Sequence, residues 1–62
     1  MTAAASAALL AEWRALHRAT FARLKSEGYT THQALIRARG DRAVRRTWAK
    51  YVTATKEERK GL

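Results

Sequence analysis

The sequence predicts an all-α fold: a single three-helix domain in which a long first helix is followed by a helix-turn-helix-like pair. Three observations favour it. Leucine and aromatic residues recur at helical spacing over residues 3–27. The chain has no proline, and its three glycines, Gly28, Gly40 and Gly61, fall where helices of ordinary length would end. Its 62 residues are enough for one small domain, over residues 1–62.

The first helix is expected over residues 3–27. Its opening is rich in alanine, which has the highest helix propensity. Apolar residues then follow at intervals of three or four, so they share one face of the helix. Gly28 is expected to end it. The residues that define the apolar face are Leu9, Trp13, Leu16, Thr20 and Leu24.

Residues 29–53 are expected to form the helix-turn-helix-like unit. Thr30 and Gln33 have the spacing of a capping box, which predicts a short helix over residues 31–39. Gly40 is expected to adopt the left-handed conformation that ends this helix, and Asp41 to cap the third helix after a tight corner. The third helix is predicted over residues 42–53, and residues 54–62 form a charged tail with room for one further turn.

The third helix separates apolar from basic side chains. Placing residues 100° apart puts two sets on opposite arcs, and no acidic residue falls on the basic arc. Like charges four residues apart repel each other, so the arc is expected to face a polyanion. The whole chain has 13 Lys and Arg against 5 Asp and Glu, a net charge of +8, which favours nucleic acid. The apolar arc is Val44, Thr47, Trp48, Tyr51 and Val52; the basic arc is Arg42, Arg45, Arg46 and Lys50.

Three groups are predicted to bind nucleic acid. The basic arc is expected to reach phosphates and guanine edges. The start of the second helix, where helix-turn-helix proteins contact DNA, is the second group, although capping explains these residues equally well. Two arginines beside the turn form the third group. These groups are Arg42, Arg45, Arg46 and Lys50; Thr30, Thr31, His32 and Gln33; and Arg37 and Arg39.

The aromatic residues and histidines are expected to be structural. Core packing is favoured over stacking on unpaired bases, because each aromatic residue falls on an apolar stripe. With no cysteine, and no acidic residue at ligand spacing beside either histidine, no metal site is predicted. No catalytic motif or cofactor-binding loop is present, so no enzyme activity and no cofactor are expected. The residues concerned are Trp13, Phe21, Trp48, Tyr51, His17 and His32.

The segment LKSEGYTTHQALIRARGDRAVRRTW, residues 24–48, resembles the helix-turn-helix domains of bacterial and phage DNA-binding proteins, including resolvase-type recombinases and small plasmid regulators. Ala34, Ala38 and Val44 stand where that pattern has two small residues and an aliphatic one. The resemblance implies a DNA-binding transcriptional regulator that acts as a homodimer on a two-fold site. The chain departs from the pattern at four positions that are usually aliphatic, namely Gln33, Arg37, Arg39 and Thr47.

Two alternatives to DNA binding remain open. The basic face could bind and inhibit an acidic host-protein surface, as a phage- or plasmid-type interaction protein, or it could bind RNA or the ribosome. Membrane contact is not expected, because no apolar run approaches ~18 residues. Residues 1–10 have neither a basic leader nor a long apolar block. A cytoplasmic protein is therefore predicted, and the absence of cysteine is compatible with that compartment.

Overall fold

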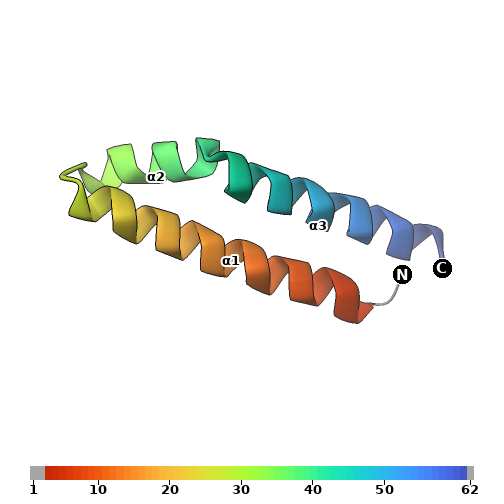
Figure 1. The fold of residues 1–62 in the computed structure, drawn as a ribbon. Coiled ribbons are helices and arrows are strands. Elements are labelled where there is room, and N and C mark those ends of the chain that lie inside the picture. Colours follow the sequence, from red (N-terminus) through yellow and green to blue (C-terminus); the bar gives the residue numbers. More distant parts are fainter. Residues whose placement is uncertain (1–2, 62) are drawn as a thin grey trace.

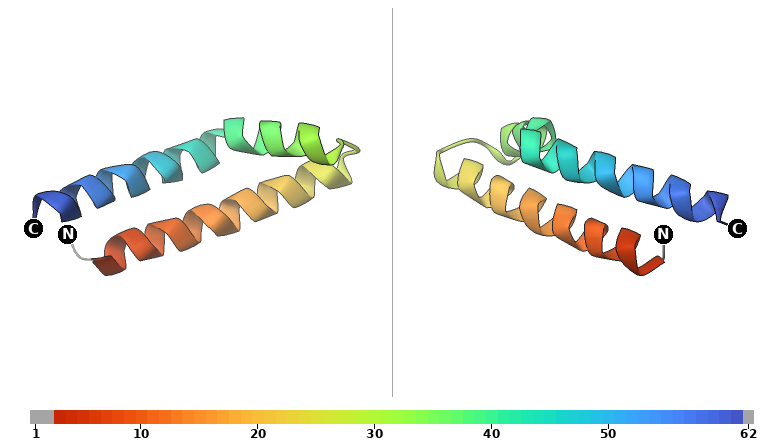
Figure 2. Two further views of the ribbon diagram at one scale, coloured as in Figure 1. Left: turned by 180° about the vertical axis from the view of Figure 1, so that it is seen from behind. Right: turned by 45° about the vertical axis from the view of Figure 1, so that its right-hand side comes forward.

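The computed structural model describes residues 3–61, with side chains from residue 5 onward, and these residues form three helices: α1 (Ala3–Ser26), α2 (Thr31–Gly40) and α3 (Arg42–Lys60). The predicted all-α fold with a long first helix is confirmed. α2 and α3 follow one another along the same side of α1 and run antiparallel to it (Figure 1), which gives a hairpin with extents of 46 × 15 × 15 Å. α1 begins and α3 ends at the same end of this hairpin (Figure 2).

The reversal after α1 is a glycine-based C-cap. Gly28 has a φ of +101°, a left-handed conformation that glycine adopts without steric cost. The Gly28 amide donates to the Lys25 carbonyl at 3.1 Å and the Tyr29 amide donates to the Leu24 carbonyl at 3.3 Å. This pair of bonds is the Schellman motif, which satisfies carbonyls left free at the helix end. Tyr29 also packs against the cluster that contains Leu24, so the turn brings α2 back onto α1.

α2 begins with the predicted capping box. The Gln33 amide donates to Thr30 Oγ1 at 3.2 Å, and the Thr30 amide donates to Gln33 Oε1 at 3.1 Å. One turn further on, Ala34 and Ala38 are 0% exposed and pack against Leu24. Because alanine has only a methyl group, these two positions let the α2 backbone lie close to α1.

A single extended residue, Asp41, joins α2 to α3. Its φ of −63° and ψ of 135° interrupt the helix for one residue, and its amide still donates to the Ala38 carbonyl at 3.2 Å. The Asp41 carboxylate accepts from the amides of Ala43 at 3.1 Å and Val44 at 3.3 Å. The prediction that Asp41 caps α3 is therefore confirmed.

The joint at Asp41 differs from the tight corner that was expected. Among residues 3–61 only Gly28 has a positive φ, so Gly40 does not take the left-handed conformation and instead forms the last residue of α2. A helix-turn-helix unit sets its two helices at about 90–120°. Here α3 continues nearly end to end from α2 (Figures 1 and 2). Both helices consequently pack on α1 and make little contact with each other.

α3 is longer than predicted. It was expected to end near residue 53 but continues to Lys60, and residue 62 of the predicted tail lies outside the described residues. Ala54 is 1% exposed, and Ser6 Oγ on α1 donates to Glu58 Oε2 at 3.0 Å. Contacts with α1 therefore hold the last two turns helical. The predicted separate turn does not form: the Thr55 hydroxyl donates to the Val52 carbonyl within the continuous α3 at 2.8 Å.

Apart from Leu24, the buried side chains among the described residues are small, and the prediction that Trp48 is a core residue is wrong. Trp48 is 43% exposed, whereas Val44 on the same arc is 2% exposed. Trp13, Phe21 and Tyr51 are half-buried. α3 contacts essentially one neighbouring helix, and one helix covers a narrower arc than the apolar stripe of α3 occupies. The buried residues of α3 are Val44, Thr47 and Ala54.

Candidate nucleic-acid interface

Four cations form one face of α3, here called the cationic face: Arg42, Arg45, Arg46 and Lys50. All four are exposed, whereas Val44 and Thr47, which alternate with them in sequence, are buried against α1. The buried side of α3 therefore fixes the direction in which the cations point. The predicted separation of apolar and basic side chains is confirmed in its outline, with Trp48 at the exposed edge of the apolar side.

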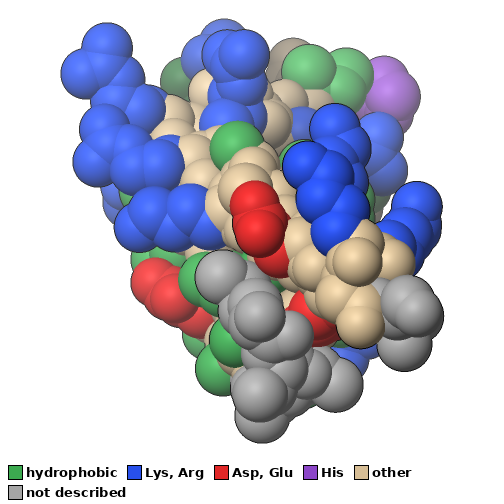
Figure 3. All heavy atoms as spheres, turned by 90° about the vertical axis from the view of Figure 1, so that its right-hand side faces the viewer, with side chains coloured by type: hydrophobic (Ala, Val, Ile, Leu, Met, Phe, Trp, Pro, Cys, Tyr) green, Lys and Arg blue, Asp and Glu red, His purple; other side chains and the backbone are tan. Residues whose placement is uncertain are grey.

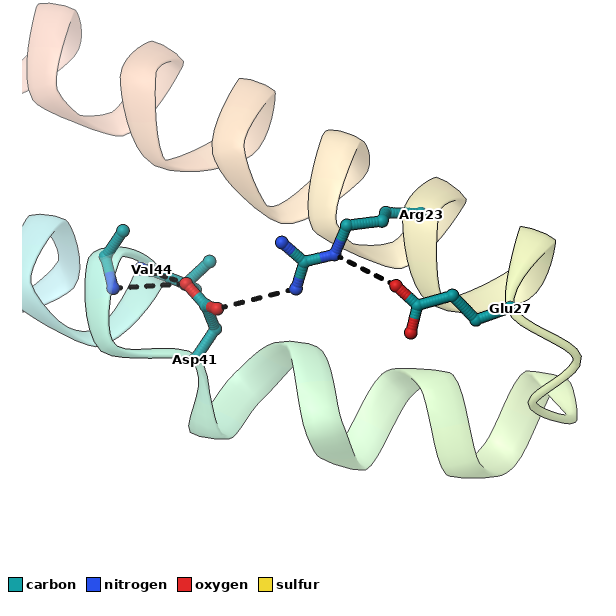
Figure 4. Close-up of polar contacts among 5 residues, drawn as sticks. Arg23, Glu27, Asp41 and Val44 are labelled. Atoms are coloured by element: carbon teal, nitrogen blue, oxygen red, sulfur yellow. Dashed lines mark hydrogen bonds and ion pairs between the residues drawn. The ribbon is translucent and has the colours of Figure 1, made fainter.

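The four residues of the cationic face form no ion pair within residues 5–61. The two ion pairs formed within residues 5–61 both belong to Arg23: its Nε lies 3.6 Å from Glu27 Oε1 and its Nη2 lies 3.9 Å from Asp41 Oδ1 (Figure 4). Asp41, the acid nearest in sequence to the cationic face, is thus occupied by Arg23 and by the first amides of α3. No carboxylate in the described part of the chain is paired with the four cations.

Three arginines of the cationic face lie around one shallow depression of the surface. Arg42, Arg45 and Arg46 line an open depression of about 460 Å³ together with Gly40. The missing side chain at Gly40 leaves the backbone accessible beside them. Figure 3, which views the hairpin from the end where α3 finishes, shows Lys and Arg side chains over the upper part of the molecule with few acidic ones among them. Such a surface attracts anions through both direct contact and its summed field.

The residues at the start of α2 do not join the cationic face. Thr30 and Gln33 are engaged in the capping box, and Thr31 Oγ1 accepts a hydrogen bond from Lys25 Nζ at 3.2 Å. His32 is exposed. The whole length of α2, about 15 Å, separates this group from Arg42. The structure therefore divides the predicted contact residues into two distant groups.

The two remaining arginines have different surroundings. The Arg37 guanidinium lies 4.3 Å from the centre of the Tyr29 ring, a cation–π contact that holds it beside the turn between α1 and α2. Arg39 lines a second depression, of about 410 Å³, together with Arg45 and with Trp13, Val44, Trp48 and Ala49. Of the two, Arg39 is thus the one that the fold brings to the cationic face.

Sequence reasoning missed the aromatic cluster beside this depression. The ring centres of Trp13 and Trp48 lie 5.0 Å apart, those of Trp48 and Tyr51 5.2 Å, and those of Trp13 and His17 5.2 Å. The helical spacing of Trp13 and Trp48 indicates that each faces the partner helix. It does not indicate how much of each ring the partner covers, which depends on the end-to-end arrangement of α2 and α3.

The described side chains offer no metal centre: residues 5–61 contain no group of three His, Asp or Glu able to hold an ion. None of the described helices has the length and apolar character of a membrane span. Comparison of the chain with protein-family models, with curated proteins and with solved structures found no match.

Proposed function

We propose that this protein binds nucleic acid through the cationic face of α3, with double-stranded DNA as the expected ligand. The observation that carries the proposal is the combination of four exposed cations, Arg42, Arg45, Arg46 and Lys50, with the absence of any acidic partner for them among the described residues. Like charges held this close repel each other, at about 0.2–0.5 kcal/mol for each i,i+4 pair. A polyanion removes that repulsion.

The dimensions of the cationic face support a nucleic-acid backbone as its partner. Arg42 and Lys50 are eight residues apart, which corresponds to about 12 Å along the helix axis. B-DNA carries about seven phosphate charges over that length when both strands are counted, so its charge density exceeds that of the cationic face. Phosphate contacts of this kind position a protein on the duplex without reading its sequence.

The biological role that follows from the resemblance is a regulator of transcription from a phage, a plasmid or a bacterial operon. The end-to-end arrangement of α2 and α3 favours a cationic face laid along the backbone over a helix inserted by the usual crossing of a helix-turn-helix pair. The alternative ligands are an acidic protein surface and RNA, and competition binding experiments distinguish both from DNA.

The test is the salt dependence of binding to a fluorescently labelled duplex, followed by anisotropy. Four phosphate contacts predict a slope of about −3.6 in a plot of log affinity against log salt concentration. Competition with unlabelled double-stranded RNA and with an acidic polypeptide of equal charge then ranks the three ligand classes. A slope near zero, or tighter binding to the polypeptide than to DNA, would refute the proposal.

A further inference from the structure

We infer that the depression between Trp13 and Trp48, here called the tryptophan depression, holds one unpaired nucleobase of a bound nucleic acid. The inference rests on the nucleic-acid binding proposed above and adds a contact that an intact duplex, in which every base is paired, does not make. The tryptophan depression has a volume of about 410 Å³, is lined by apolar side chains of α1 and α3, and has two arginines as its charged residues. This combination matches a nucleotide, whose base has a flat face that stacks on aromatic rings and whose phosphate is negatively charged.

Trp48 is a fixed and accessible aromatic surface. Its ring lies between those of Trp13, at 5.0 Å and tilted by 53°, and Tyr51, at 5.2 Å and tilted by 40°. These contacts restrict the ring, yet 43% of the residue remains exposed. Base–aromatic stacking requires a ring that is both held in place and open on one side, because the base then loses no contact energy to reorganisation of the platform.

The charged residues of the tryptophan depression connect it to the cationic face. Arg45 belongs to both, since it lines this depression and also the one that it shares with Arg42 and Arg46. Arg39, at the end of α2, lies on the tryptophan depression as well. A strand whose phosphates follow the cationic face therefore passes beside Trp48, where an unpaired base can turn inward.

The composition of the lining selects a nucleotide over a peptide. Val44 and Ala49 complete the apolar surface, and no residue of the lining is acidic or carries an amide or hydroxyl side chain. Arginine and tryptophan side chains only donate hydrogen bonds, so a peptide would find no side-chain acceptor here for its backbone N–H groups, at a cost in free energy. A base placed on Trp48 has its polar edge directed to solvent and its phosphate within the field of the two arginines.

The experiment compares three ligands of the wild-type protein by fluorescence anisotropy. They are a short oligothymidylate of about eight nucleotides, an oligomer of equal length whose nucleotides are abasic, and a blunt duplex. The first two carry the same phosphates and differ only in their bases. Stacking of one base predicts affinity for the oligothymidylate about 5- to 150-fold above that for the abasic oligomer. Quenching of tryptophan fluorescence should accompany binding of the oligothymidylate alone.

Two variants locate the effect at Trp48. In Trp48→Leu, which keeps an apolar side chain without an aromatic face, the preference for oligothymidylate over the abasic oligomer should fall to about unity; in Trp48→Phe an intermediate preference should remain. Ile36→Ala is the matched control, because Ile36 is 57% exposed on α2 and does not line the tryptophan depression. Circular dichroism checks that each variant is folded, and the wild-type comparison stands without them.

The outcomes separate the two proposals. Equal affinity for the oligothymidylate and the abasic oligomer, together with tight duplex binding, would overturn the tryptophan depression as a base site and leave the proposed function intact. Failure to bind any of the three ligands would overturn both. Tighter binding of an acidic, tyrosine-containing peptide than of the oligothymidylate would reassign the depression to a protein partner and overturn the inference.

Discussion

Removing two charges from the cationic face should weaken DNA binding far more than removing two charges elsewhere. Arg42 and Arg46 are exposed, lie one turn apart and are not paired with any described carboxylate. We consider the double variant Arg42→Gln/Arg46→Gln. Glutamine has a helix propensity close to that of arginine, and its introduction removes an i,i+4 repulsion, so the helix itself should not lose stability.

The magnitude follows from counterion release. Each phosphate contact contributes about 0.9 to the slope of log affinity against log salt, so losing two contacts should reduce the slope by about 1.8. At about 0.15 M salt this corresponds to a decrease in affinity of about 30-fold, with the difference vanishing as salt approaches 1 M. The assay is anisotropy of a labelled duplex at several salt concentrations, with far-ultraviolet circular dichroism to verify helicity.

A matched control is present on α1. Arg14 and Arg18 are also exposed arginines four residues apart, so Arg14→Gln/Arg18→Gln removes the same charge with the same spacing. A small decrease in this variant is expected from net charge alone. Equal decreases in both double variants would refute the assignment of binding to one face of α3, because net charge would then be sufficient.

Three further predictions concern stability. Val44→Ala removes two buried methyl groups from a residue that is 2% exposed and should cost about 2 kcal/mol, which lowers the melting temperature by about 10 °C; an unchanged melting temperature would contradict the core described above. Ala38→Leu should destabilise the fold by about 1–3 kcal/mol, because Ala38 is 0% exposed at the contact with α1 and a larger side chain does not fit there. Ala43 is exposed, so Ala43→Leu should leave the melting temperature nearly unchanged. Asp41→Ala removes the cap of α3 and should lower the free energy of unfolding, measured in urea, by about 1 kcal/mol. Asp41→Asn should lower it much less, because asparagine also caps helices. Equal losses in the two variants would assign the effect to the Arg23 ion pair instead.

Features that depend on neighbouring residues were predictable from the sequence. The capping box of Thr30 and Gln33, the N-cap at Asp41 and the helix end at Gly28 each involve groups within five residues of one another. Such interactions are encoded by residue type and spacing. The same holds for the segregation of the cationic face from Val44 and Thr47, which requires only that the segment be helical.

Features that depend on the partner helix were not predictable in this way. The charged composition after residue 53 favours an exposed tail, but Ala54 and Glu58 contact α1 and so extend α3 to Lys60. Glycine often ends a helix in the left-handed conformation, but Gly40 remains helical. The extended conformation of Asp41 ends α2 instead.

The sequence by itself determined where the helices begin and which side of α3 carries positive charge, because local hydrogen bonds and helical periodicity decide both. The tertiary structure alone decided that α2 and α3 lie end to end against α1. That arrangement leaves only one helix to cover the apolar side of α3, and one helix is too narrow to bury all of it. Trp48 therefore remains accessible beside Arg39 and Arg45, and the tryptophan depression exists for that reason.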